Sequence, residues 1–105
     1  MKLTEKKRIV VKVGTSTLTH DTGKTNIARM AKLVSVLADL KNAGHQVVLV
    51  SSGAVGIGAG KLGMRERPDH TSGLQACAAV GQCELMFLYD KLFSEYGVVV
   101  SQLLF

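Results

Sequence analysis

Two hydrophobic periodicities follow one another along this chain, and together they predict alternating strands and helices. Short runs rich in Val, Ile and Leu at residues 8–13 and 46–50 are bounded by turn residues, which is typical of buried strands. A further apolar run at residues 98–105 predicts a third strand. Strands that alternate with helices favour an open α/β sheet.

The segments between these runs carry apolar residues at helical spacing. The first helix is expected to be capped by Asn26 or Thr25 and to end at Gly44 in the left-handed conformation. Two more helices are expected at residues 53–62 and 73–95. The apolar face of the first helix consists of Ile27, Met30, Ala31, Val34, Leu37 and Ala38.

The first two predicted strands end in similar residues. Residues 8–13 run into Gly14-Thr15-Ser16-Thr17, and Val50 is followed by Ser51-Ser52-Gly53. Ligands of open α/β sheets bind at the carboxyl ends of strands, where glycine admits an anion and a helix N-terminus adds a positive dipole. The sequence therefore predicts an anion cradle where the two strand ends meet.

Lys12 is the most specific charged residue in this pattern. It lies between Val11 and Val13 in a strand expected to be central, so its ammonium must either reach solvent or meet an anion. We favour the anion; the alternative is a lysine facing solvent at a sheet edge. Ser51 and Ser52 also have a plainer possible role as N-caps of the next helix.

The glycines after the second strand do not complete a nucleotide-binding loop. Residues 60–62 lack the hydroxyl that a Walker A loop needs, and the GxGxxG match at residues 58–63 begins well after the strand end. A packing role is about as strong an interpretation as a direct ligand role. We expect close helix packing at Gly81 and, in the glycine segment, at Gly56, Gly58 and Gly60.

Composition narrows the possible functions. The 105 residues are 47% hydrophobic and 20% charged, which fits one small globular domain rather than a disordered chain. The net charge of +5 comes partly from a basic start that includes Lys6, Lys7 and Arg8. No aromatic residue lies among these basic residues, so nucleic-acid binding is disfavoured and attraction of small anions is favoured.

Cysteines and histidines show no metal-ligand spacing, and no metal site is predicted. Cys77 and Cys83 fall in an apolar helical pattern, so we expect small core residues in a reducing compartment. His20, His45 and His70 fall in polar turns and are expected at the surface. With no signal-peptide pattern and no apolar run of membrane length, the sequence predicts a cytoplasmic protein without membrane contact.

Four segments of the chain share the pattern of one known family: Val10–Ser16, Val50–Val55, Gln75–Gln82 and Ser101–Leu104. Together they resemble the amino acid kinase family, and the resemblance runs from Arg8 onward. It implies a three-layer α/β/α sandwich with a mainly parallel sheet. Residues 1–105 would form its N-terminal portion, and the apolar ending at 98–105 agrees with a longer protein that continues through the kinase domain and any C-terminal domain.

The resemblance also implies an activity and roles for individual residues. The enzyme would transfer the γ-phosphate of ATP to the side-chain carboxylate of L-glutamate, giving L-glutamyl 5-phosphate, the first step of proline biosynthesis. It would act with Mg²⁺, whose ligands would lie outside these residues, as a homo-oligomer, and the 105 residues alone would be inactive. Lys12 would contact the phosphate in transit. The remaining roles would be phosphate binding by Gly14 and Thr15 and substrate binding by Ser52, Gly53 and Ala54.

The chemistry of the residues agrees with this activity. An ionised carboxylate needs no general base, and phosphoryl transfer depends mainly on positioning and charge neutralisation. Two alternatives remain open. The chain could belong to a family member with another acceptor, such as a carbamate, aspartate, acetylglutamate or a nucleotide. It could also be a non-enzymatic α/β module that binds phosphate or nucleic acid through Lys12 and the N-terminal lysines.

Overall fold

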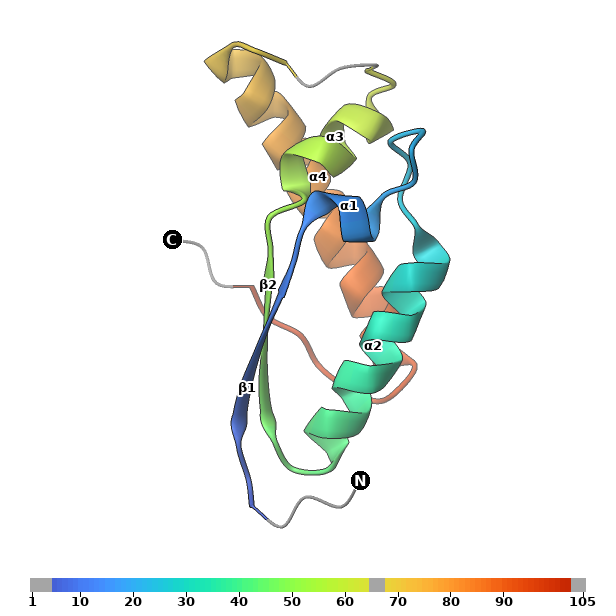
Figure 1. The fold of residues 1–105 in the computed structure, drawn as a ribbon, viewed down its shortest axis with the longest axis vertical. Coiled ribbons are helices and arrows are strands. Elements are labelled where there is room, and N and C mark those ends of the chain that lie inside the picture. The colour runs from blue at the N-terminus through green and yellow to red at the C-terminus, as the bar shows by residue number, and fades with distance from the viewer. Residues whose placement is uncertain (1–4, 65–67, 103–105) are drawn as a thin grey trace.

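The computed structural model describes residues 5–64 and 68–102, which form two parallel strands and four helices (Figure 1). The strands are β1 (Arg8–Val13) and β2 (Gln46–Ser51). The first predicted strand is confirmed with its bounds, and the second extends one residue further than expected. The helices, in chain order, are α1 (Thr15–Leu18), α2 (Ile27–Asn42), α3 (Ala54–Lys61) and α4 (Thr71–Ser94).

The sheet register brings the carboxyl ends of both strands to the same edge. β1 and β2 pair in parallel, with Lys12 opposite Val50 and Val13 opposite Ser51. Helix α2 connects the two strands, while α1 and α3 begin just beyond the ends of β1 and β2 (Figure 1). This architecture is compatible with an α/β kinase fold. It contains the parallel sheet expected from the sequence.

Only one face of the sheet is covered within the described residues. Val11, Val13 and Leu49 point into a core that α2 and α4 complete. On the other face, Val10 is 60% exposed and Val48 is 41% exposed. The expectation of strands buried on both sides is therefore wrong for this part of the chain, because no described element covers that second face.

Helix α2 has the start, the end and most of the buried face that the sequence predicts. The Asn26 side-chain oxygen accepts a hydrogen bond from the Arg29 N–H at 3.1 Å, which identifies Asn26 as the cap. The chain leaves the helix through Gly44, whose φ is +103°. Ile27, expected on the apolar face, is exposed. The buried residues of the helix are Met30, Val34, Leu37 and Ala38.

Helices α3 and α4 approach each other through glycines. A side chain at Gly58 would overlap the backbone of Cys77, and one at Gly81 would overlap the carbonyl of Ala54. Gly60 likewise lies against the backbone of Gly23 in the loop before α2. The prediction of close packing at Gly58, Gly60 and Gly81 is confirmed.

The predicted third strand is not formed by residues 98–102. Gly97 turns the chain with a φ of +71°, and the Val98 N–H donates to the Phe93 carbonyl at 3.1 Å. Val98 and Val100 then pack against the core. Val99, between them, is 92% exposed, and the described part of the chain shows no strand paired with this segment. The rest of the predicted strand, residues 103–105, lies outside the described residues.

Two further expectations about side-chain exposure are wrong. His45 is only 2% exposed, because it lies one residue before β2 in phase with the inward-facing Val47 and Leu49. Its Nδ1 accepts a hydrogen bond from the Lys7 N–H at 3.0 Å. Cys77 is buried as expected, but Cys83 is exposed. His20 and His70 are exposed as predicted.

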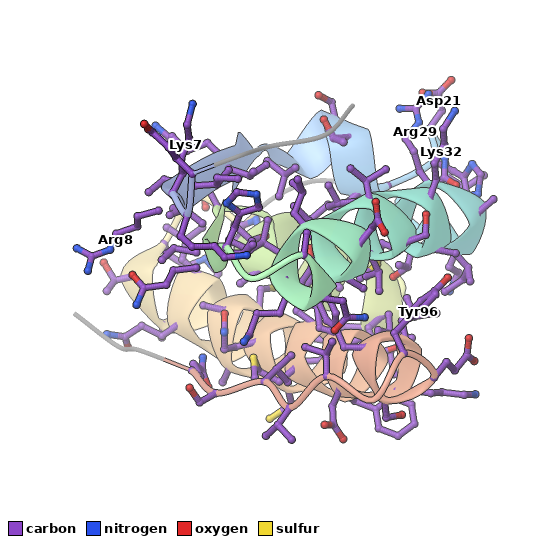
Figure 2. The ribbon with its side chains drawn as sticks, turned by 90° about the horizontal axis from the view of Figure 1, so that it is seen from below. Lys7, Arg8, Asp21, Arg29, Lys32 and Tyr96 are labelled. Atoms are coloured by element: carbon purple, nitrogen blue, oxygen red, sulfur yellow. The ribbon has the colours of Figure 1, made fainter. Side chains whose placement is uncertain are left out.

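Charged side chains project outward from the fold. Lys7 and Arg8 lie at one end in Figure 2, while Arg29 and Lys32 lie at the other with Asp21. Because these basic residues are separated, the net charge does not place them in a single basic patch. Among the described residues, no helix is both long enough and apolar enough to cross a membrane.

Candidate functional site

The two glycine-containing strand ends lie side by side, as the sequence predicts. The Ser52 N–H donates to the Val13 carbonyl at 3.3 Å, which extends the pairing of β1 and β2 beyond the last strand residues. Gly14 and Gly53 therefore follow adjacent strands at one edge of the sheet. The chain then enters α1 after β1 and α3 after β2 (Figure 1).

The β1 end leaves open space above the backbone. A Cβ atom added at Gly14 would meet no atom within 4 Å. The Gly14 carbonyl accepts a hydrogen bond from the Thr17 N–H at 3.2 Å, which closes the single turn of α1 that begins at Thr15. An anion could approach the backbone closely at this position, because no side chain stands in the way.

Lys12 lies on the uncovered face of the sheet and is exposed. It is opposite Val50 and two residues before Gly14, so its side chain leaves the backbone close to the strand ends. β1 pairs only with β2 among the described residues, and the strand that was expected to be central is an edge of this sheet. Anion binding by Lys12 stays a prediction.

Ser51 and Ser52 face different environments. The Ser51 hydroxyl is buried, whereas Ser52, one residue later, is exposed at the edge of the sheet. Burial raises the pKa of the Tyr89 phenol, and the nearby Ser51 hydroxyl partly opposes this rise. The hydroxyls of Ser51 and Tyr89 are near each other, but neither makes a hydrogen bond of normal geometry within the described residues.

The start of α3 shows that neither serine is its N-cap. Gly53 occupies the N-cap position, and no side chain caps the helix there. The buried Gly53 accepts the Ile57 N–H at 3.0 Å through its carbonyl. The capping interpretation of Ser51 and Ser52 is therefore wrong, and the exposed Ser52 hydroxyl stands just before a helix N-terminus.

The arrangement suits a small anionic ligand at an open edge. Lys12, Ser52 and the starts of α1 and α3 all follow or lie near the carboxyl ends of β1 and β2, and the first backbone N–H groups of a helix lack intrahelical partners. Two hollows of about 520 and 270 Å³ lie around Lys61 and Glu84, and none of the six candidate residues lines either of them. Within the described residues no three His, Cys, Asp or Glu side chains could jointly hold a metal ion.

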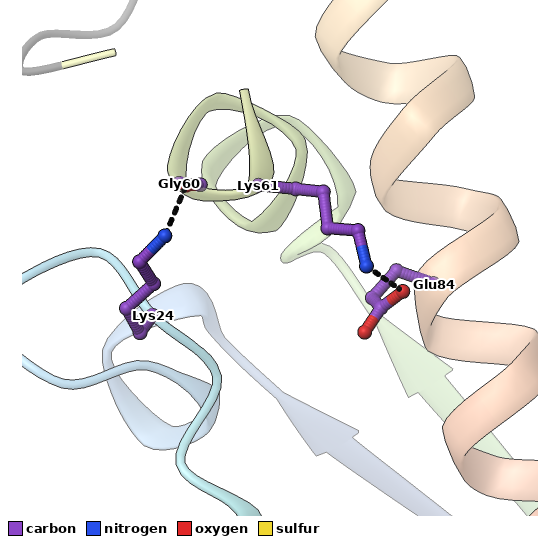
Figure 3. A network of polar contacts seen from close by, with 4 residues as sticks. All are labelled: Lys24, Gly60, Lys61 and Glu84. Carbon is purple, nitrogen blue, oxygen red and sulfur yellow. Dashed lines mark hydrogen bonds and ion pairs between the residues drawn. The ribbon is translucent and has the colours of Figure 1, made fainter. Parts of the chain in front are cut away.

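Polar contacts anchor the C-terminal end of α3. The Lys61 ammonium forms an ion pair with Glu84 of α4, 3.0 Å between Nζ and Oε2 (Figure 3). The Lys24 ammonium donates to the Gly60 carbonyl at 3.4 Å, which links the loop before α2 to the same helix end. These contacts and the glycine crossings fix the helix that follows Ser52.

Tyr89 is the neighbour of the site that sequence reasoning missed. It lies on α4 between the buried Leu85 and Phe93, at four-residue spacing, so its burial could have been predicted. The proximity of Tyr89 to Ser51 could not have been predicted, because the two residues are 38 positions apart in sequence and lie on different elements.

The chain is similar in sequence to a known family and to several named proteins. The sequence model of the amino acid kinase family matches residues 7–105. The chain is 58% identical over 102 residues to a protein of Moorella thermoacetica named glutamate 5-kinase, which covers 97% of this chain. Proteins of the same name from Clostridium perfringens and Listeria welshimeri are 55% and 53% identical, each over 97% of this chain.

The match covers a minor part of these relatives. The aligned residues make up 27% of the Moorella protein, 38% of the Clostridium protein and 37% of the Listeria protein. The chain thus spans about a quarter to two-fifths of the length of the curated relatives that it matches.

Proposed function

The chain belongs to the amino acid kinase family, and we propose that it is the N-terminal part of an enzyme that phosphorylates the side-chain carboxylate of L-glutamate with ATP. The observation that carries this proposal is 53–58% identity, across almost the whole chain, to proteins named glutamate 5-kinase. The product would be L-glutamyl 5-phosphate, the first intermediate on the way to proline.

The open strand-end edge suits this reaction. The glutamate carboxylate is ionised at neutral pH, so one of its oxygens attacks the γ-phosphorus directly while the bond to the ADP oxygen breaks. No proton has to be removed from the nucleophile. The protein has to hold two anions together and stabilise the negative charge that spreads over the phosphoryl oxygens.

We assign the phosphate side of this site to β1. The Lys12 ammonium would contact the phosphoryl group in transit, because it is the cation nearest in sequence to the open backbone at Gly14. Gly14 and Thr15 would offer backbone N–H groups to the same phosphate, with no side chain obstructing Gly14.

We assign the acceptor side to the end of β2. The exposed Ser52 hydroxyl would donate a hydrogen bond to the glutamate, while Gly53 and Ala54 would present the first backbone N–H groups of α3. The adjacency of β1 and β2 supports this division, because the two anions have to meet in line.

Kinases of this type generally act on ATP together with Mg²⁺. The described residues do not form a group of ligands fit for a metal ion, so the ligands of Mg²⁺ would lie elsewhere in the enzyme. Residues 1–105 would form the first portion of the three-layer kinase domain, in keeping with the uncovered sheet face. Assembly into a homo-oligomer and a cytoplasmic location stay predictions.

A coupled assay of ADP release tests the proposal on the full-length enzyme that carries this chain. We expect turnover with ATP and L-glutamate, and little with aspartate, acetylglutamate or carbamate. The 105 residues alone should release no ADP above background. Turnover with a different acceptor would identify another member of the family. Salt-sensitive DNA binding without any response to glutamate would favour the non-enzymatic module.

A further inference from the structure

The segment Gln75–Gln82 carries part of the family resemblance, yet it contributes no residue to the site just described. The structure places this segment in α4, where two of its residues touch α3 through the backbone. On this basis we propose that Gly81 is a positioning residue for the acceptor side of the site. The proposal rests on the function proposed above.

The contact between the two helices is reciprocal. A Cβ at Gly81 would overlap the Ala54 carbonyl and lie 2.8 Å from the Gly58 nitrogen. A Cβ at Gly58 would in turn overlap the Cys77 carbonyl and lie 2.9 Å from the Cys77 Cα. Ala54 and Gly58 are one turn apart on α3, as Cys77 and Gly81 are on α4. Each glycine therefore receives the backbone of the opposite helix.

The partners in these contacts are backbone atoms, which cannot rotate away. A flexible side chain could turn aside from an added methyl group, but the carbonyl of Ala54 can move only if α3 moves with it. Gly81 is buried, so the methyl group has no solvent to enter. A side chain at position 81 must therefore displace the start of α3 or separate the helices.

Displacement of Ala54 reaches the site through covalent bonds. Ala54 is the first residue of α3, and Gly53 and Ser52 directly precede it. The Ser52 N–H is held by the Val13 carbonyl, so the segment 52–54 is fixed at one end by β1 and at the other by α4. Gly81 thus determines where the hydroxyl of Ser52 and the first N–H groups of α3 lie.

The test is G81A in the full-length enzyme, with separate measurement of the two Michaelis constants. We expect the KM for L-glutamate to rise about tenfold or more, since small misplacements of bound reactants are costly. The KM for ATP should change less than about twofold, because the proposed phosphate ligands belong to β1. The thermal unfolding transition should remain cooperative.

Two control variants separate positioning from stability. G73A makes the same substitution in the same helix, where the added methyl meets the exposed His70 ring at 2.7 Å and Pro68 at 2.8 Å instead of α3. C77A removes a buried thiol without adding atoms to the crossing, and should lower the melting temperature. Both should leave the KM for L-glutamate unchanged.

The outcomes are distinct. A G81A enzyme with a lowered melting temperature and a normal KM for L-glutamate would overturn the proposal, as would an equal rise of both Michaelis constants. If G81A does not fold, G58A crowds the same crossing from the Cys77 side and should show the same selective rise. Failure of both variants to fold would make these glycines purely structural. A wild-type enzyme without glutamate kinase activity would instead refute the proposed function.

Discussion

At the scale of single residues, strand geometry gives two adjacent serines separate environments. The Ser51 hydroxyl is enclosed with that of Tyr89, and Ser52 is exposed where β2 leaves the sheet. A buried hydroxyl without a partner lowers stability, because it has lost its hydrogen bonds to water. The buried hydroxyl of Ser51 is therefore expected to lower stability, while the exposed hydroxyl of Ser52 is available to a ligand.

Tyr89→Phe tests this enclosure. Burial raises the pKa of the Tyr89 phenol above its usual value of 10.0, so above that pH the unfolded chain ionises first and the folded protein loses stability. Near pH 7 the substitution should be close to neutral, because it removes an unpartnered hydroxyl. Between pH 8 and pH 11 the variant should lose less stability than the wild type in urea unfolding. Parallel curves for the two proteins would contradict this.

Lys12→Ala separates a catalytic from a structural role. Because Lys12 is exposed, its loss should change the free energy of unfolding by less than about 0.5 kcal/mol. If its ammonium neutralises the phosphoryl group in transit, kcat of the full-length enzyme should fall by about 10² to 10³. Steady-state kinetics and urea unfolding measure the two effects. Normal kcat in a folded variant would leave Lys12 as a solvent-facing strand residue.

At the scale of elements, α2 is the helix whose ends depend most clearly on named residues. Its first turn contains no acidic residue, so the Asn26 side chain is the main feature that stabilises its start. The helix ends at Asn42, and Gly44, just beyond the C-cap residue, has the left-handed conformation that most residues avoid.

Asn26→Ala should lower the free energy of unfolding by about 1 kcal/mol, because the Arg29 N–H loses its acceptor. Asn26→Asp is the matched control and should retain most of the stability, since a carboxylate also caps a helix start. Urea unfolding of the three proteins measures the difference. Equal stability of the alanine variant and the wild type would show that water replaces the cap at no cost.

The elements differ in how far the sequence predicts them. Helix α2 and strand β1 follow from local patterns of apolar residues and turn residues, and both are found at the expected positions. Residues 98–102 have the composition of a strand, but a strand also needs a partner, and local pattern cannot supply one. His45 was misplaced for a related reason, since its burial depends on its phase with β2 rather than on its polar neighbours.

The candidate site was predictable to a similar degree. Parallel pairing of two glycine-ended strands was enough to predict that the two strand ends lie side by side, as the pairing of Val13 with Ser51 and the Ser52 N–H bond to the Val13 carbonyl show. The contacts of α4 with Ala54 and near Ser51 were not predictable, because they depend on how a distant helix packs. Tight packing could be expected at Gly81, but the sequence does not indicate that Gly81 packs against Ala54.

At the scale of the whole molecule, the described fold is elongated. Its extents are 48 × 28 × 19 Å and its radius of gyration is 14.9 Å, compared with about 13 Å for a compact domain of this size. One face of its two-stranded sheet exposes Val10, Val48 and Val50. Two-stranded sheets are marginally stable alone, and exposed apolar patches mark surfaces that other elements cover.

Replacing these three valines by threonine tests whether the open face matters. The isolated 105 residues should bind a fluorescent hydrophobic dye, and the V10T/V48T/V50T variant should bind clearly less of it, because the patch loses apolar area. A control with Val34→Thr, at a buried position of α2, should instead lower the unfolding midpoint. Equal dye binding by the triple variant and the wild type would locate the exposed apolar surface elsewhere.

The opposite environments of Ser51 and Ser52 also bear on how this sequence can change over evolutionary time. Substitutions along β2 alter one side chain each, but an inserted or deleted residue reverses the facing of every later one. Such a change would send the Ser52 hydroxyl toward Tyr89 and expose its neighbour. We therefore expect β2 to keep a constant length between His45 and Gly53, and length variation to accumulate in loops.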